Sequence, residues 1–492
     1  KNVNLNVLNE LVSRWPKSEY IQEAQFRRGE ILFIQQDYAG AEQAYQVVLD
    51  NGSGSRFYEQ SLYKHGWSCF KQGFYPPGIE SFLTLMDRKL GMLEEVDVAT
   101  KVDSLSRADR ELFDDTMRVM SLVFSYEDGA DSIRSYVEEH QSSNYVYLLY
   151  QSLADLYLEK ERYSDAAGVF QAYAADYPEH FEAPVFQAQS IEAYKDGGFP
   201  SLVFESKKQY VSIYGLTADY WNSWVPEQRP EVVAELRVSL SDLAQYDHFR
   251  AQQDKDPEAY AAAAEWYQKY LDYFPNDPDA AERTFLLAEA LMESAQPLEA
   301  MQAYQKVAYN YQEFPEAADA GFAAILASRA YAQTLSSEAA VAWDAQQIME
   351  DLKFANAYPD EMKSSSVLIS VAEQLFENQR FTAASIVAGE VLTREPAAAD
   401  EFQQVAWRVV SHARFDQASY VYAEQAYREL AQQDISSSEQ DEVQQRIAAS
   451  IFRQAEADQL AGNIDAAVAN YLRIDGSSDI KAKAVFDAAT LL

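Results

Sequence analysis

Five histidines and one cysteine are the side chains of this sequence best suited to acid–base, nucleophilic or metal chemistry. None of the histidines stands in an HExxH motif or in another familiar metal-ligand spacing. A catalytic base also needs partners within hydrogen-bond reach, which the sequence around each histidine does not supply. We therefore predict surface or helix-packing roles for the histidines, which are His65, His140, His180, His248 and His412. The sequence predicts no catalytic residue, no metal site and no cofactor.

The one cysteine, Cys69, stands between Trp67 and Phe70. A lone cysteine excludes an internal disulfide and any CxxC motif, and this apolar setting favours a buried structural thiol over a reactive one. The sequence has no P-loop, GxGxxG or GxSxG motif. The acidic stretch 127–131 (EDGAD) lacks the spaced oxygen ligands of a calcium loop. The chain is therefore not expected to be an enzyme.

Carboxylates form a more regular pattern. Pairs separated by four positions share one face of a helix, and such pairs are Asp155 with Glu159, Glu289 with Glu293, and Glu373 with Glu377. Glu30 and Glu456 occupy the same position of the repeat as the first member of each pair, directly after a small residue. We hypothesise that these residues form an acidic column on a concave wall, which binds a basic or amine-bearing segment of a partner protein. The alternative is an ordinary solvated face in a chain with 78 acidic and 40 basic residues.

An aromatic cluster is the second candidate for binding a partner. Tyr220, Trp221 and Trp224 lie in the stretch 217–230 (TADYWNSWVPEQRP). Tryptophan and tyrosine give a large contact area at low entropic cost, so they are frequent at interfaces. The alternative is that they fill a seam where a regular array is interrupted.

Helical hairpins must position these side chains. In the segment 150–178, Tyr150, Leu153, Ala154 and Tyr157 share one face of a first helix. A second helix presents an apolar face that begins at Tyr163, and Pro178 ends it because a prolyl nitrogen cannot donate a hydrogen bond. Small residues let the two helices approach closely, and the spacing of Ala154 and Ala166 recurs in the pairs Gly29–Ala41, Gly66–Gly78, Ala288–Ala300 and Ala372–Ala384.

This pattern resembles the tetratricopeptide repeat (TPR), a helical hairpin of about 34 residues with small residues at the crossing, then an aromatic and a terminal proline. Weaker copies fill most of the remaining chain, which gives about eleven hairpins in all. The resemblance implies an all-α fold, a right-handed α-solenoid superhelix of TPR-like hairpins whose first helices line the concave wall.

Four places depart from the repeat. Residues 88–107 are expected to be an insertion, and the helices at 231–249 and 336–357 are expected to be longer than usual. The stretch 217–230 is too rich in proline and aromatic residues for a continuous helix. We therefore predict an array at 1–216, an irregular aromatic connector at 217–230 and a second array at 231–492. The last helix, from Asp479, presents an apolar face with no second helix to cover it, so we expect the array to be cut within a repeat.

The charge balance narrows the classes of partner. The formal net charge of −38 disfavours nucleic acid and anionic membrane surfaces, both of which bind clustered lysine and arginine. No apolar run is long enough for a membrane span. Basic protein segments are the favoured partners, and added salt should weaken their binding.

The style of the repeat junctions suggests a cellular context. Sequences such as AYAADYPEHFEAP and LDYFPNDPDAAE resemble repeats of bacterial cell-envelope proteins, including outer-membrane assembly lipoproteins and periplasmic Tol-system coordinators. The region 103–215 is also similar to large envelope proteins associated with proton-channel motors of the TolQ/ExbB type. The resemblance implies a protein-binding scaffold that is periplasmic or associated with the outer membrane, with envelope or motor components as partners.

Two other functions remain open. A scaffold for polysaccharide export or binding would use the same fold, with aromatic and acidic residues contacting sugar. A cytosolic TPR adaptor would use a clamp of lysine and arginine on the first helices, where this chain has mostly acidic residues.

Overall fold

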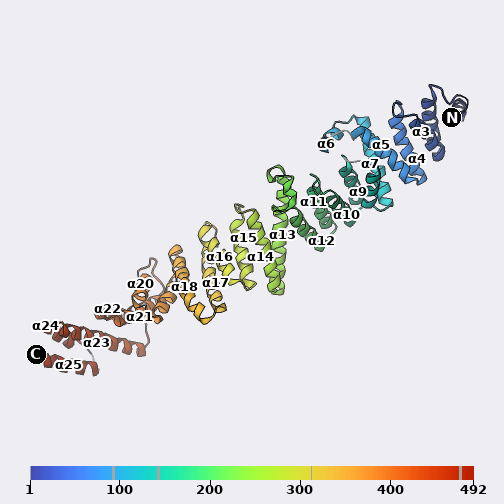
Figure 1. The fold of residues 1–492 in the computed structure, drawn as a ribbon. Coiled ribbons are helices and arrows are strands. Elements are labelled where there is room, and N and C mark those ends of the chain that lie inside the picture. Colours follow the sequence, from blue (N-terminus) through green and yellow to red (C-terminus); the bar gives the residue numbers. More distant parts are fainter. Residues whose placement is uncertain (1, 91–94, 141–143, 312, 476–478) are drawn as a thin grey trace. The chain divides into compact units, whose positions relative to one another are not determined.

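A computed structural model describes residues 2–90, 95–140, 144–311, 313–475 and 479–492 (Figure 1). These residues form 25 α-helices and two short 3-10 helices, and no β-strand occurs among them. The all-α prediction is confirmed, and many consecutive helices pack against each other as hairpins. Within the described ranges, no helix combines the length and the apolar character that crossing a bilayer requires.

Contacts divide the chain into two units, and we describe each by itself. Unit 1 is Lys1–Leu243 and unit 2 is Ala244–Leu492, so the division falls inside helix α13 (Pro230–Asp254). The sequence prediction instead places the break at 217–230. That predicted domain boundary stays a prediction, because a division by contacts does not test whether the connector separates two arrays.

The described residues of unit 1 form twelve helices before α13. They are α1 (Asn2–Arg14), α2 (Ile21–Ile34), α3 (Tyr38–Asp50), α4 (Tyr58–Gln72), α5 (Tyr75–Leu90), α6 (Glu95–Asp103), α7 (Arg107–Tyr126), α8 (Ala130–His140), α9 (Val146–Glu159), α10 (Tyr163–Asp176), α11 (Ala183–Asp196) and α12 (Pro200–Tyr214). Most of them pack against their neighbours in sequence, whereas α7 packs mainly on α9, and α8 also contacts α5 and α10.

Unit 2 continues the same arrangement after α13. Its helices are α14 (Pro257–Tyr273), α15 (Ala280–Glu293), α16 (Pro297–Asn310), α17 (Ala317–Thr334), α18 (Ser337–Ala357), α19 (Met362–Glu377), α20 (Phe381–Leu392), α21 (Asp400–Asp416), α22 (Tyr420–Leu430), α23 (Ser437–Leu460), α24 (Ile464–Leu472) and α25 (Asp479–Leu491). Packing between neighbours in sequence follows from the repeat, because each hairpin buries its apolar face against the next hairpin.

The hairpin of α9 and α10 has the core that the sequence predicts. Ala154 and Ala166, the two small residues, are both fully buried. Tyr150 and Phe170 are also buried, and Tyr150 donates a hydrogen bond of 3.0 Å to Asp176 at the end of α10. The polar turn between the helices stays exposed. The spacing of apolar residues therefore identified both helices and the faces by which they pack.

The small residues make room for aromatic rings as well as for the facing helix. A Cβ atom added at Gly66 on α4 would lie 2.5 Å from Cε1 of Phe82 on α5, and one added at Gly29 on α2 would lie 2.6 Å from the ring of Tyr45 on α3. Neither distance is compatible with a van der Waals contact. A glycine at these crossings thus lets the aromatic residue of the second helix lie directly on the backbone of the first.

A left-handed residue joins the two helices of most hairpins. After its first helix, each of these hairpins has one turn residue with positive φ, at Gln36, Gly73, Glu161, Gly198, Ala295, Gln379, Ala418 and Gly462. This conformation costs an L-amino acid roughly 1–2 kcal/mol, whereas glycine adopts it readily. Five of these turns therefore carry strain in a non-glycine residue.

Replacing Ala295 with glycine is expected to stabilise unit 2 by about 0.5–1 kcal/mol, because relief of the strained backbone exceeds the added entropy of the unfolded chain. Ala295 has a φ of 60°. Urea denaturation followed by tryptophan fluorescence measures the effect. Ala288→Gly is the matched control, because Ala288 is fully buried within α15. Removing its methyl group should destabilise unit 2 by about 1 kcal/mol or more. Equal losses in the two variants would contradict the argument from strain.

The four segments that depart from the repeat in sequence contain unusual helices, whereas their role as an insertion or a connector stays a prediction. Two 3-10 helices, Asp219–Asn222 and Pro226–Gln228, replace a continuous helix in the connector. Helices α13 and α18 are long, with 25 and 21 residues, as predicted, and α23, with 24 residues, is a long helix that the sequence analysis missed. Helix α6 lies within the predicted insertion, of which residues 91–94 lie outside the described residues.

Candidate functional site

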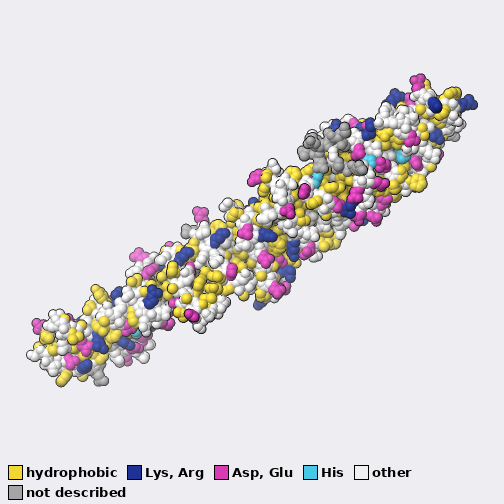
Figure 2. Space-filling model, viewed as in Figure 1, with side chains coloured by type: hydrophobic (Ala, Val, Ile, Leu, Met, Phe, Trp, Pro, Cys, Tyr) yellow, Lys and Arg dark blue, Asp and Glu magenta, His cyan; other side chains and the backbone are white. Residues whose placement is uncertain are grey.

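The predicted acidic column divides between the two units. Its members in unit 1 are Glu30 on α2 and Asp155 and Glu159 on α9, and its members in unit 2 are Glu289 and Glu293 on α15, Glu373 and Glu377 on α19, and Glu456 on α23. All of them lie on the first helices of hairpins, as predicted. Lysine and arginine are interspersed with acidic side chains on the face shown in Figure 2, so charge alone does not mark a site.

Two members of the column are held by internal partners. Glu30 accepts a hydrogen bond of 2.6 Å from the hydroxyl of Tyr45 and lies 3.8 Å from the amine of Lys64. Glu456 forms an ion pair of 2.8 Å with Arg453, three residues earlier on the same helix. Both carboxylates thus have structural roles, and their predicted part in binding a partner stays a prediction.

The pair Asp155 and Glu159 lines a concave feature of unit 1. This feature, the α7–α9 groove, is a pocket of about 480 Å³ with walls from α7 and α9. Phe113 and Met117 of α7 form its buried floor. Leu148 and Leu156 of α9 add apolar surface beside the carboxylates. The groove therefore combines an apolar floor with an acidic edge.

The carboxylates of the α7–α9 groove are only partly compensated. Arg118 and Asp114 of α7 also line the groove, and each pairs within its own helix: Arg118 with Asp115 at 2.6 Å and Asp114 with Arg110 at 3.4 Å. Neither of these two ion pairs includes Asp155 or Glu159. Partial loss of hydration in the groove raises the pKa of Asp155, and the charge of Glu159 raises it further. A hydrogen bond of 2.8 Å from Gln151 lowers this pKa, but its effect is smaller. A cation at this edge would relieve the repulsion between the two carboxylates.

The pair Glu289 and Glu293 has similar electrostatics in unit 2. Partial burial and the charge of Glu293 raise the pKa of Glu289. Burial, followed by the charges of the same two carboxylates, raises the pKa of Tyr304 on α16. Glu373 and Glu377 on α19 are both exposed. The structure thus confirms that each pair shares a helix face, whereas its role in binding stays a prediction.

The aromatic cluster packs against its own unit. Tyr220 is buried, and the indole N–H of Trp221 donates to the carbonyl of Tyr214 at 3.0 Å. The indole N–H of Trp224 donates to the carbonyl of Glu179 at 3.2 Å. These contacts match the alternative in which the aromatic residues fill the interruption. Binding of a partner by the cluster stays a prediction.

Arg229, which the sequence analysis did not single out, organises this cluster. Its guanidinium is buried, lies 5.0 Å from the ring centroid of Trp224, and donates to the hydroxyl of Tyr220 at 2.6 Å and to Glu231 at 2.6 Å. It also donates to the carbonyl of Phe181. A signal was present in the sequence, because one arginine in a segment with three aromatic rings suggests a cation–π contact.

Four of the histidines have the packing roles that the sequence predicts, and His140 is the exception. Burial lowers the pKa of His65, His248 and His412, and burial followed by the charge of Arg229 lowers the pKa of His180 to about 4. His140 on α8 instead lies between two carboxylates of α5, with its ring nitrogens 2.8 Å from Glu80 and 2.8 Å from Asp87. Burial opposes its charged form, but these hydrogen bonds outweigh burial and raise its pKa.

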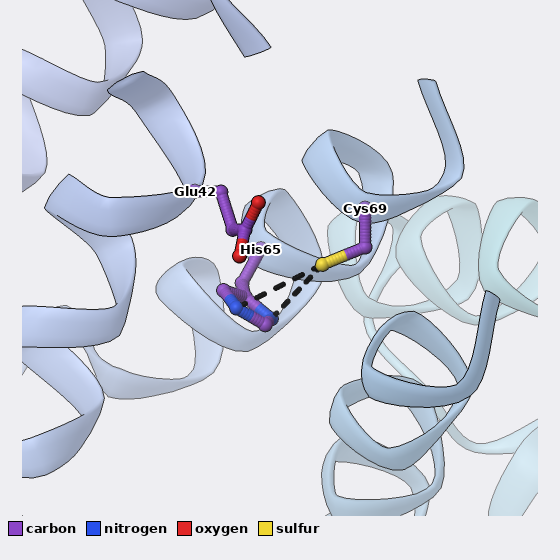
Figure 3. A group of neighbouring side chains, drawn as sticks. All are labelled: Glu42, His65 and Cys69. Atoms are coloured by element: carbon purple, nitrogen blue, oxygen red, sulfur yellow. Dashed lines mark hydrogen bonds between the residues drawn. The ribbon is translucent and has the colours of Figure 1, made fainter. Parts of the chain in front are cut away.

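A cluster of metal-ligating side chains lies between α3 and α4. Glu42, His65 and Cys69 each offer one ligand atom, and these atoms all lie within 4.8 Å of one another (Figure 3). His65 and Cys69 are buried and stand four positions apart on α4, and Glu42 comes from α3. The sequence analysis missed this cluster. The spacing of His65 and Cys69 was a signal, but the third ligand comes from another helix.

Comparisons with known proteins find distant similarity to solved structures. No protein-family model matches the chain, and no curated protein matches it in sequence. Solved structures similar to it include the TPR domain of P58(IPK), with 16% identity, a TM-score of 0.21 and coverage of 70% of this chain and 97% of that chain. The human IFIT1 dimer with m7Gppp-AAAA has 11% identity, a TM-score of 0.25 and coverage of 99% and 94%. The complex of Naa15 and Naa10 bound to HypK-THB has 12% identity, a TM-score of 0.23 and coverage of 99% and 74%. Scores this low carry no argument about function.

Proposed function

We propose that this protein is a non-catalytic scaffold that binds a basic segment of a partner protein in the α7–α9 groove. The observation that carries the proposal is the combination, in one concave feature, of a buried apolar floor at Phe113 and Met117 with the carboxylates of Asp155 and Glu159. An apolar floor supplies binding free energy through burial, and carboxylates select the charge of the ligand.

A lysine or arginine side chain fits the acidic edge for an electrostatic reason. Asp155 and Glu159 repel each other across one turn of α9, and the pKa of Asp155 is raised by lost hydration and by this repulsion. A bound cation would remove the repulsion and favour the ionised form of both groups. An apolar side chain next to the basic residue would fill the floor of the groove, so the expected ligand alternates basic and apolar residues.

The location proposed for this scaffold is the bacterial periplasm or the outer-membrane surface. The support is the resemblance of the repeat junctions, such as the segment 172–184, to envelope TPR proteins. Envelope or proton-channel motor components are the proposed partners. Affinity capture from fractionated cells, with low-salt and high-salt washes, tests this part. Envelope proteins lost at high salt agree with it, and cytosolic proteins retained through the wash contradict it.

Reversing two charges in the groove tests the binding site. The variant Asp155→Lys with Glu159→Lys is expected to bind a fluorescent peptide that alternates lysine and leucine at least about tenfold more weakly than the unchanged chain, which corresponds to about 1.4 kcal/mol. Fluorescence anisotropy at low and high salt measures the affinity. The difference between the two proteins should shrink as salt rises, because salt screens exposed charges.

A matched variant separates the groove from the general charge of the protein. Asp196→Lys with Glu227→Lys makes the same change in net charge at two exposed residues of unit 1 outside the groove. This control should keep most of the affinity for the lysine–leucine peptide. Equal losses in both double variants would mean that the peptide senses only the net charge, and the groove would then not be the binding site.

A further inference from the structure

The cluster of Glu42, His65 and Cys69 has an arrangement close to a metal coordination shell. The Sγ atom of Cys69 lies 3.8 Å from each ring nitrogen of His65, Nδ1 and Nε2. In a tetrahedral zinc site, with a Zn–S distance of about 2.3 Å and a Zn–N distance of about 2.0–2.1 Å, a sulfur and a nitrogen ligand lie about 3.5 Å apart. The two residues of α4 are therefore close to the required separation before any ion binds. Glu42 is half-buried, so its carboxylate can move toward them.

Neighbouring side chains orient two of the three ligands. Nδ1 of His65 lies 2.8 Å from Oγ of Ser81 on α5, which leaves Nε2 for an ion. Gln72 donates a hydrogen bond of 2.7 Å to Oε2 of Glu42, which leaves Oε1. Metal-binding histidines usually have their second ring nitrogen held in this way, and such partners raise metal affinity. The cluster thus has a second layer of contacts as well as the ligand atoms.

The charges of the three ligands would balance those of a divalent ion. Gln72, a neutral side chain, donates a hydrogen bond to Glu42. A divalent ion bound through the thiolate of Cys69, the carboxylate of Glu42 and the neutral imidazole of His65 would meet two negative charges, so the net charge of the bound site would be zero.

We propose that Glu42, His65 and Cys69 bind one Zn²⁺ ion between α3 and α4. One sulfur, one nitrogen and one oxygen ligand suit zinc, whereas magnesium and calcium require oxygen ligands and copper(I) favours sulfur ligands. Binding forms a Zn–S bond and releases the Cys69 proton to solvent. The fourth position is taken by a water molecule. The ion would connect α3 to α4, two helices from successive hairpins of unit 1.

Cobalt(II) provides a direct test with the full chain, because a cobalt–thiolate bond gives a charge-transfer absorption band in the near ultraviolet. Titration of the metal-free protein with Co²⁺ is expected to produce this band with one equivalent of metal, and Zn²⁺ should remove it. One proton should be released for each ion bound. Since the chain has one cysteine, the band assigns the site to Cys69.

Variants distinguish this site from weak binding to surface carboxylates. Cys69→Ser should abolish the band, and His65→Gln should weaken Zn²⁺ binding at least about 100-fold, measured by competition with a chelator. Glu42→Gln keeps a hydrogen-bonding side chain at a half-buried position, so it tests the third ligand without a large risk to folding. His412→Gln, which alters a histidine of lowered pKa in unit 2, is the matched control and should bind Zn²⁺ normally.

Two results would overturn the proposal. The first is a protein that takes up Co²⁺ without the thiolate band, since such binding would use oxygen ligands of the acidic surface. The second is a Zn²⁺ affinity that stays unchanged in both Glu42→Gln and His65→Gln. A circular dichroism spectrum of each variant shows whether it is folded, so a loss of binding in a folded variant is attributed to the ligand.

Discussion

Replacing Phe170 with alanine is expected to destabilise unit 1 by about 4 kcal/mol, the cost typical of removing a fully buried phenylalanine side chain. Phe170 is 1% exposed and occupies the aromatic position of the hairpin formed by α9 and α10. Its ring lies 5.4 Å, centroid to centroid, from that of Phe186 on α11. Alanine would leave a cavity where one hairpin meets the next, and the neighbouring helices can collapse into it only partly.

Hydrogen exchange followed by mass spectrometry is the most informative measurement for Phe170→Ala. Each hairpin packs mainly on its neighbours, so the loss of protection should be largest in peptides from α9, α10 and α11 and small in unit 2. Phe249→Ala, at a side chain that is 58% exposed on α13, should cost no more than about 0.5 kcal/mol. A uniform loss of protection over both units would contradict a local origin of stability.

Replacing Glu424 with alanine is expected to destabilise unit 2 by about 3 kcal/mol, because it leaves two cations and a buried amide without their acceptor. Glu424 on α22 is 5% exposed. Each of its oxygens accepts a hydrogen bond of 2.9 Å from Arg473, which follows α24. Gln454 on α23 donates to it at 2.9 Å, and Arg428 forms an ion pair of 2.9 Å with it. One carboxylate therefore connects α22, α23 and the segment after α24.

The effect of Glu424→Ala should depend on pH. Burial by itself would raise the pKa of Glu424, but the hydrogen bonds from Gln454, Arg428 and Arg473 outweigh it and hold the pKa below its ordinary value. A carboxyl group with a lowered pKa in the folded state stabilises the protein above its unfolded pKa of about 4.3, and this contribution is lost as the pH falls through the folded pKa. The difference in the free energy of unfolding between the unchanged chain and Glu424→Ala should therefore be largest at pH 7 and should shrink under acidic conditions.

Urea denaturation at pH 7 and at pH 3 measures this difference. Arg428→Gln is the control, because Arg428 is half-exposed and its ion pair with Glu424 lies within one helix, so its loss should cost under about 1 kcal/mol. Suppose that the loss in the free energy of unfolding is as large at pH 3 as at pH 7. The destabilisation would then come from lost packing and not from the ionised carboxylate.

The two proposals concern different helices of unit 1 and are independent. Binding of a basic segment depends on Asp155 and Glu159 in the α7–α9 groove. Binding of zinc depends on Glu42, His65 and Cys69 between α3 and α4. Charge reversal in the groove should leave zinc binding unchanged, and Cys69→Ser should leave binding of the lysine–leucine peptide unchanged. Either proposal can therefore fail without affecting the other.

The sequence by itself determined the helical hairpins. The small residues Ala154 and Ala166 are buried as their spacing predicts, and Tyr150 and Phe170 pack beside them. The hairpins were predictable because backbone hydrogen bonds and side-chain contacts in a helix join residues three or four positions apart. The two helices of a hairpin are also joined by a short turn, so all of these interactions are local in sequence. Local sequence patterns therefore contain the information that the hairpins need. The proline and aromatic content at 217–230 indicated that no continuous helix forms there, because a prolyl nitrogen cannot donate a helical hydrogen bond.

Only the tertiary structure decided which polar side chains have partners. Glu30 and Asp155 stand at equivalent positions of the predicted column, yet the hydroxyl of Tyr45 on the next helix donates to Glu30, whereas Asp155 accepts a hydrogen bond from Gln151 on its own helix. His65 and Cys69 become candidate metal ligands because Glu42 reaches them from α3. Such contacts join side chains from different helices, and their distances depend on how the helices pack. Periodicity along one helix gives the face on which a residue lies, and the packing of neighbouring helices decides what that residue meets.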